Sequence, residues 1–126
     1  MAMATSEAEA IYRIGGVVYK LLWPAERFAT HFNPRLRMSA EATLARWRKM
    51  QAMSMRHPCF NRMLLVERPH PAFVSRYVDG RPPTPDELQE VVDDLRRHRL
   101  AVLDVTRDNV IVGERGPVVV DFFVEA

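Results

Sequence analysis

Asp104-Val-Thr-Arg-Asp-Asn109, followed by the apolar runs 109–112 and 117–120 and then by Asp121-Phe122-Phe123, is the stretch that decides the fold. It offers an aspartate, an asparagine five residues later, and a second aspartate at the end of an apolar strand. Phosphoryl-transfer sites use this spacing to position a nucleophile and to hold magnesium. The stretch therefore predicts a phosphate-handling site that is built on a short loop and a β-hairpin.

The composition indicates a soluble globular chain. With 126 residues, of which 48% are hydrophobic and 27% charged, it has the size of one domain or of a small two-lobed one. No apolar run approaches the roughly 20 residues that span a bilayer, and residues 1–10 lack the pattern of a signal peptide. The single cysteine, Cys59, excludes internal disulfides. We expect a cytoplasmic protein, or an exported one without an apolar signal.

The charge is unevenly distributed along the chain. The net charge is only +2, but between Glu26 and Glu67 the single acid, Glu41, stands among many arginines. This region is either a solvated basic face or a site for phosphate, nucleic acid or an acidic protein. Only Lys20 and Lys49 are lysines. A lysine at the end of an apolar strand is therefore informative, since arginine does not replace it in buried sites.

The chain alternates strand and helix signals in the order β-β-α-β-β, linker, α, loop, β-β. Residues 25–38 are expected to hold a short helical turn and a basic loop. This order predicts an α+β fold with a small antiparallel sheet. The expected segments are strands at 10–14 and 17–22 around Gly15-Gly16, a helix at 40–54 capped by Ser39, strands at 63–66 and 72–78, a linker at 79–83, and the hairpin 109–112 and 117–120.

The second helix has the clearest start. Thr84 is a predicted N-cap, Pro85 occupies the first helical position, and Glu87 completes a capping box. Its expected buried stripe is Leu88, Val91, Val92 and Leu95.

In this order the residues resemble the protein-kinase-like fold over residues 6–123. The motif Asp104-x-Thr106-x-x-Asn109 is more similar to that of the atypical RIO and lipopolysaccharide-kinase-like kinases than to that of typical eukaryotic kinases. The resemblance implies a kinase-like N-lobe and hinge at 1–80 and a truncated C-lobe at 81–126. It also implies bound ATP and Mg²⁺ and transfer of phosphate to a hydroxyl acceptor. The implied roles are catalysis by Asp104, nucleotide binding by Lys20, Glu41, Tyr77 and Val78, with Glu41 paired to Lys20, and metal binding by Asn109 and Asp121.

Four departures from the kinase pattern keep other functions open. Residues 6–10 stand where a Gly-rich loop is expected, Val102-Leu103 replace a His-Arg or His-Gly pair, Phe123 replaces glycine, and an activation segment is absent. A truncated C-lobe predicts a protein partner or a homodimer that covers its apolar underside. The alternatives are a pseudokinase that serves as an interaction module and, less favoured, an Arg-rich nucleic-acid-binding domain. No membrane partner is expected.

The remaining titratable residues show no metal pattern in the sequence. The histidines at 31, 57, 70 and 98 do not stand at metal-ligand spacing from one another or from Cys59. We therefore expect Cys59 to be an inert thiol and His98 to interact with the end of its helix.

Overall fold

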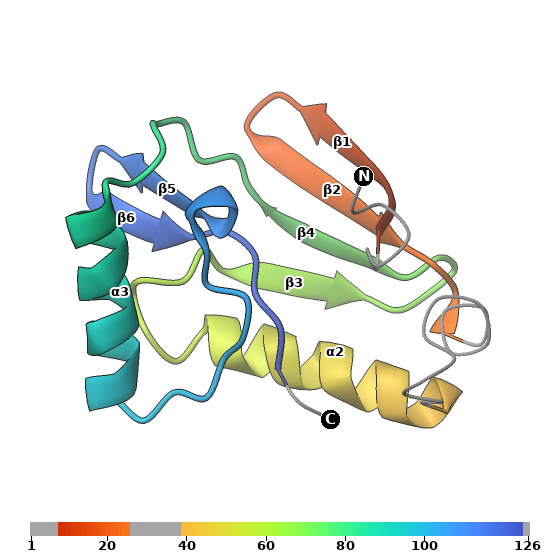
Figure 1. Ribbon diagram of the computed structural model, residues 1–126. Helices are drawn as coiled ribbons and strands as arrows, with labels where there is room; N and C mark the ends of the chain where they lie inside the picture. The colour runs from red at the N-terminus through yellow and green to blue at the C-terminus, as the bar shows by residue number, and fades with distance from the viewer. Residues whose placement is uncertain (1–7, 26–38, 125–126) are drawn as a thin grey trace.

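The computed structural model describes residues 8–25 and 39–124, and the expected turn and loop within 26–38 lie outside them. The fold is α+β, as the order of the segments predicts. Its larger sheet is antiparallel, has four strands and runs in the order β1-β2-β4-β3 (Figure 1). These strands are β1 (Ala8–Ile14), β2 (Val17–Leu22), β3 (Met63–Val66) and β4 (Ala72–Arg76).

The hairpin of β1 and β2 turns at Gly15-Gly16. Gly15 has φ +60°, which a glycine adopts without steric cost. In the register of the sheet, Lys20 lies opposite Ile11 on β1 and opposite Phe73 on β4. Because side chains alternate along a strand, these three residues share one face of the sheet.

Helix α2 (Ala40–Ser54) packs along the sheet beneath β3 in Figure 1. Ser39 is its N-cap and accepts a hydrogen bond from the Ala42 amide, as the sequence predicts. Trp47 and Met50 are fully buried, and Leu44 packs against the same core. The helix is therefore held by the apolar face that its spacing indicates.

Two polar side chains of α2 also bind the outer edge of β3. The Leu65 amide donates to Gln51 Oε1 at 2.6 Å, and the Met63 amide donates to Ser54 Oγ at 3.2 Å. An edge strand otherwise presents unpaired N–H groups, so the helix satisfies the edge that it covers.

The C-terminal part contains α3 (Pro85–Arg97), a 3₁₀ turn η2 (Arg107–Asn109), and a hairpin of β5 (Val110–Gly113) and β6 (Gly116–Val119). The capping box of Thr84 and Glu87 is confirmed, with Pro85 at the start of the helix. In the stripe, Val91 and Leu95 are buried and Leu88 packs against the core.

Four strands have bounds that differ from the expected ones. β1 begins at Ala8 and not at residue 10, and β4 ends at Arg76 and not at residue 78, although the Tyr77 amide still donates to the Gly16 carbonyl at 2.9 Å. β5 begins at Val110, because Asn109 closes the 3₁₀ turn before it through a local hydrogen bond to the Thr106 carbonyl at 3.0 Å. β6 covers 116–119 and not 117–120.

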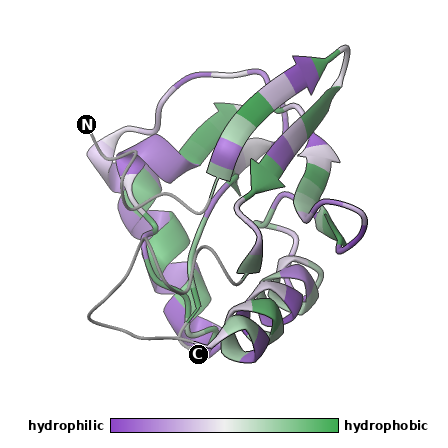
Figure 2. Cartoon of the chain, turned by 90° about the vertical axis from the view of Figure 1, so that its right-hand side faces the viewer, coloured by the Kyte–Doolittle hydropathy of each residue, from purple (hydrophilic) through white to green (hydrophobic). Residues whose placement is uncertain are grey.

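One hydrophobic cluster connects the two parts. It contains Leu22 and Phe73 from the sheet, Trp47 from α2, Leu95 from α3 and Phe122 from the segment after β6. Figure 2 shows the corresponding alternation of hydrophobic and hydrophilic residues along the strands and around the helices. None of the helices within the described residues has the length and apolar character needed to cross a membrane.

Gly80 lies in the linker between β4 and α3, where the chain passes beside β5, and it tolerates no side chain. A Cβ at this position would clash with the Val112 carbonyl oxygen. This oxygen belongs to the backbone, and the Val112 and Arg81 backbones exchange two hydrogen bonds. The oxygen therefore cannot move aside freely. We predict that Gly80→Ala lowers the free energy of unfolding by about 1–3 kcal/mol, as measured by urea denaturation.

Gly16→Ala is the matched control, since a Cβ at Gly16 meets nothing within 4 Å. Its stability is expected to remain close to that of the wild type. Equal stabilities of the two variants would contradict the close approach at Gly80.

The Arg81–Glu87 pair links the linker to the start of α3 and makes stability depend on pH. Hydrogen bonds from Arg81 and from the Thr84 amide lower the pKa of Glu87 to about 2. A carboxyl with a depressed pKa stabilises the fold above its ordinary pKa, and this contribution is lost as the pH falls through the lower value. We predict that Glu87→Gln loses less stability than the wild type between pH 5 and pH 2, measured by urea denaturation across that range. Parallel pH profiles of the two proteins would contradict the assignment.

Candidate functional site

A cavity of about 260 Å³ separates the sheet from the β5–β6 hairpin. Its walls are mostly apolar, and its polar groups gather at two places. Most sites for small molecules have this character, with apolar walls and a few convergent polar groups. The lining residues are Ile11, Val18, Lys20, Asn61, Met63, Phe73, Ser75, Arg76, Tyr77, Val78, Ile111, Val120 and Asp121.

Lys20 and Asp121 form an ion pair at one end of this cavity. Lys20 Nζ lies 3.1 Å from Asp121 Oδ2, with side-chain exposures of 18% and 36%. The other oxygen, Asp121 Oδ1, accepts from the Phe122 amide at 2.9 Å. Because the lysine comes from the middle of the sheet and the aspartate follows β6, the pair spans the two walls of the cleft.

Asp104 and Asn109 form a second polar pair. The Asn109 side-chain amide donates to the Asp104 carbonyl at 2.9 Å and to Asp104 Oδ2 at 3.1 Å. Asp104 has φ +64°, a conformation that few residues other than glycine adopt. Such backbone strain is concentrated at functional sites and is retained where the surroundings fix it. Aspartate tolerates it better than most residues, which suits this position.

Backbone bonds bring Asp104 and Asn109 close to the Asp121 segment. Leu103 and Phe123 exchange two hydrogen bonds, of 2.7 and 3.0 Å, and the Val120 amide donates to the Asn109 carbonyl at 2.9 Å. Thus Leu103, which precedes Asp104, and Asn109 itself are bonded to residues on either side of Asp121. The exposed Asp104 and the half-buried Asn109 do not line the cavity itself.

Leu103 and Phe123, which both depart from the pattern expected around this loop, are the residues that form this pairing. Leu103 lacks the polar side chain expected before Asp104, and its backbone hydrogen bonds to Phe123 hold the loop in place instead. The Phe123 ring lies 5.3 Å from the Arg46 guanidinium of α2, within the range of a cation–π contact. Phe123 thereby connects the loop to the helix under the sheet.

The expected partner of Lys20 differs from the one in the structure. Glu41 is exposed in the first turn of α2, and within the described residues Lys20 makes its ion pair with Asp121. Glu41 does not meet Lys20. The helix turns Trp47 and Met50 toward the core, and Glu41 lies on its exposed side.

Tyr77 and Val78 line the opposite end of the cavity, where the chain leaves β4. The Tyr77 amide donates a hydrogen bond to the Gly16 carbonyl, whereas Val78 makes no backbone hydrogen bond within residues 8–25 and 39–124. The Arg13 guanidinium stacks on the Tyr77 ring at 3.5 Å from its centroid. This contact closes the outer side of the connecting segment against the β1–β2 turn.

Sequence reasoning missed most of the apolar wall. Val18, Ile111 and Val120 line the cavity beside Lys20 and Asp121. The sequence does indicate Val18 as a lining residue, because it stands two residues before Lys20 and therefore on the same face of its strand. Ile111 and Val120 had no such signal, since only the docking of the hairpin places them opposite the sheet.

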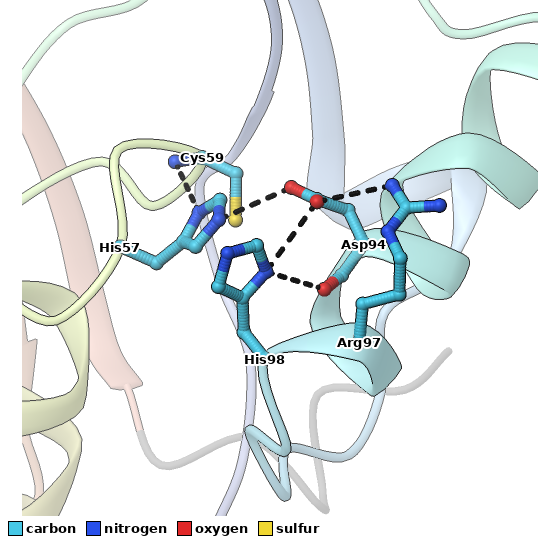
Figure 3. Close-up of polar contacts among 5 residues, drawn as sticks. All are labelled: His57, Cys59, Asp94, Arg97 and His98. Carbon is cyan, nitrogen blue, oxygen red and sulfur yellow. Dashed lines mark hydrogen bonds and ion pairs between the residues drawn. The ribbon is translucent and has the colours of Figure 1, made fainter.

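A second polar group lies at the end of α3 and was not expected (Figure 3). His57 Nε2 lies 3.1 Å from Asp94 Oδ2, and His98 Nδ1 lies 3.4 Å from Asp94 Oδ1. The two imidazole rings meet edge to face, with centroids 4.5 Å apart. The sequence shows no metal-ligand spacing for these histidines, and folding nevertheless joins them with Asp94, because it brings together positions whose sequence spacing carries no signal.

Electrostatics around this group favour a charged carboxylate and a neutral thiol. The hydrogen bond from Arg97 is the main cause that lowers the pKa of Asp94, with further contributions from His57 and His98. Burial, followed by the charge of Asp94, raises the pKa of the Cys59 thiol to about 11. Cys59 is thus protonated at neutral pH, as is typical of an unreactive cysteine.

A comparison with protein-family models finds no match for this chain, and a comparison with curated proteins finds none either. Any functional interpretation therefore depends on the residues and the geometry described above.

The Lys20–Asp121 pair is expected to couple the sheet energetically to the segment after β6. In a double-mutant cycle of Lys20→Met and Asp121→Asn, we predict a coupling free energy of about 0.5–1 kcal/mol, read from urea denaturation. Because the pair is partly shielded from solvent, the coupling is expected to change little with added salt.

The pair of Arg48 and Glu67 provides the matched control, since both side chains are more exposed. Its coupling is expected to fall as salt is added. A Lys20–Asp121 coupling of zero, or one as sensitive to salt as the control, would contradict the bridging role.

Proposed function

We propose that this chain binds ATP with Mg²⁺ in the cleft between the sheet and the β5–β6 hairpin, as a minimal kinase-like protein that transfers phosphate to a hydroxyl acceptor. The observation that carries the proposal is the cavity whose one end holds Lys20 and Asp121 and whose other end is formed by Tyr77 and Val78. The resemblance of the sequence to atypical kinases assigns the phosphates to the first end and the adenine to the second.

The apolar middle of the cleft suits a flat aromatic base. Ile11 and Val18 from the sheet lie on one side, and Ile111 and Val120 from the hairpin on the other. The volume of about 260 Å³ lies near the lower limit of small-molecule sites, which begin at about 300 Å³. The backbone groups of Val78, which have no backbone partner in the described part of the chain, are available to hydrogen-bond the edge of the base.

The polar end has the donor atoms that magnesium and phosphate require. Mg²⁺ prefers oxygen ligands, and the Asp121 carboxylate with the side-chain carbonyl of Asn109 would supply them. The Asn109 amide group is oriented by Asp104, which leaves its carbonyl oxygen without a partner among the described residues. When bound, the ion spreads the charge of the transferring phosphoryl group. Lys20, released from Asp121, would then neutralise the phosphates.

Asp104 is the group proposed to receive the proton of the acceptor hydroxyl. Its carboxylate is exposed, so an acceptor can reach it from solvent. Its position is fixed by the Asn109 amide and by the strained backbone conformation. A base held in this way contributes mainly by positioning, which is the principal requirement of phosphoryl transfer.

One observation favours a second candidate function, a nucleotide-binding module without turnover. Asp104 and Asn109 stay outside the lining of the cavity, while Lys20 and Asp121 lie within it. The role proposed for Asp104 concerns transfer alone, whereas Lys20 and Asp121 serve binding, so the two functions separate experimentally. Formation of ADP that is lost in Asp104→Asn supports the kinase, whereas nucleotide binding without ADP formation supports the module.

The first test is the effect of ATP with Mg²⁺ on thermal stability. A ligand at about 100 times its Kd stabilises the native state by about 2.7 kcal/mol, which raises the Tm of a domain of this size by on the order of 10 °C. We predict such a rise for the wild type, a much smaller one for Lys20→Ala, and loss of the Mg²⁺ dependence in Asp121→Ala.

A matched pair of substitutions locates the binding in the cleft. Val18→Phe fills the cavity and is expected to abolish the ATP-dependent rise in Tm. Val17→Phe changes the neighbouring residue, which does not line the cavity, and is expected to retain the rise. The proposal fails if the folded wild type shows no change in Tm with ATP and Mg²⁺, or if Val18→Phe binds as the wild type does.

A further inference from the structure

The group formed by His57, Asp94 and His98 has the donor set of a transition-metal site. Each residue offers one ligand atom, and these atoms all lie within 4.8 Å of one another. His57 comes from the loop after α2, whereas Asp94 and His98 stand at i and i+4 at the end of α3. Two imidazoles and one carboxylate form the three-ligand combination that open zinc sites use.

Each imidazole lies at about the distance from an Asp94 oxygen that separates adjacent ligands on a tetrahedral ion. Zinc binds nitrogen and oxygen at about 2.0–2.2 Å, which places neighbouring ligand atoms roughly 3.3–3.5 Å apart. His57 Nε2 lies 3.1 Å from Asp94 Oδ2, and His98 Nδ1 lies 3.4 Å from Asp94 Oδ1. With 54% of its side chain exposed, His98 is free to complete the geometry by a small rotation.

The hydrogen bonds show where the ion would enter. His57 Nδ1 accepts from the Cys59 amide at 3.0 Å, so in the neutral ring the proton sits on Nε2 and is donated to Asp94. His98 Nδ1 lies 2.9 Å from the Asp94 carbonyl and therefore carries its proton as well. A cation would replace these two protons between the rings and the carboxylate, at the expense of the hydrogen bond from Cys59.

The surroundings suit a bound cation with one open position. Arg97 donates to Asp94 Oδ1 at 3.1 Å and orients the carboxylate from outside, as outer partners of metal ligands do. A cavity of about 380 Å³ adjoins the group and is lined by Asp94, Arg97, Glu90, Asp93, Cys59, Val91 and Pro117. Water can therefore reach the Asp94 side of the group.

We propose that His57, Asp94 and His98 bind Zn²⁺, with water as the fourth ligand. Imidazole nitrogens select zinc and the neighbouring transition metals, whereas Mg²⁺ prefers oxygen. The ion ties the loop after α2 to the end of α3 and thus clamps the sheet-bearing part to the C-terminal part. None of the three ligands lines the cleft of Lys20 and Asp121, so this site is independent of the proposed nucleotide site.

The test is direct titration of the full chain, first stripped with a chelator, with Zn²⁺ by calorimetry, and with Co²⁺ by absorption spectroscopy. We expect one equivalent of Zn²⁺ to bind and the Co²⁺ complex to show the intense visible bands of tetrahedral coordination. His98→Ala, a change at an exposed side chain, is expected to weaken Zn²⁺ binding at least 100-fold. Excess Mg²⁺ is expected not to displace Zn²⁺ from this group, because two of its three ligands are imidazole nitrogens.

Two variants keep the outcome decisive. His70→Ala removes a histidine that pairs with Glu9 on the other side of the fold, and its affinity for Zn²⁺ is expected to equal that of the wild type. Asp94→Asn preserves the shape of the carboxylate and is expected to weaken binding without unfolding the chain, as checked by circular dichroism. The proposal is overturned if the wild type takes up no Zn²⁺, or if His98→Ala and His70→Ala bind it equally.

Discussion

The pairing of the loop at residues 59–61 with β6 is the interaction on which the rest of the structure depends. The Val119 amide donates to the Cys59 carbonyl at 2.7 Å, and the Asn61 amide donates to the Val119 carbonyl at 2.8 Å. Between them Phe60 is buried, with its ring centroid 4.8 Å from that of Phe122. Backbone polar groups can be buried only where they are paired, so these bonds allow the aromatic core to close across the two parts.

The cleft follows from this attachment and from a second one. Arg81 and Val112 exchange backbone hydrogen bonds of 3.1 and 2.8 Å, which fix the other strand of the hairpin beside the linker. Held at both strands, the hairpin presents Ile111 and Val120 to the face of the sheet that carries Lys20. A rigid scaffold of this kind is what a binding site needs, because ligands gain affinity where the groups that they meet are already in place.

The loop that joins the two parts also carries His57, two residues before Cys59. The Cys59 amide donates to His57 Nδ1 and thereby sets the tautomer in which the ring meets Asp94. Both candidate sites therefore depend on the conformation of one loop, although they lie on different sides of it. A change in this loop would alter the cleft through Asn61 and the polar group through His57.

Features whose cause lies within a few residues were predictable from the sequence. The capping box of Thr84 and Glu87 and the turn at Gly15-Gly16 act locally, and both are confirmed. The contact of Asp104 with Asn109 has the same basis, since five residues of a short turn hold the two side chains together. Strand ends were less predictable, because a strand ends where its ladder to another segment ends, as at Arg76 of β4.

The sequence by itself determined the α+β order, the helix caps and the presence of acidic residues around an apolar hairpin. Only the tertiary structure decided which charges meet: Lys20 pairs with Asp121 and not with Glu41, and Asp94 gathers His57 and His98. The physical reason is that local signals act over a few residues of chain, whereas a choice among several acids depends on how the buried faces pack. That packing is fixed by the whole core, to which Trp47, Phe60 and Phe122 contribute from three separate segments.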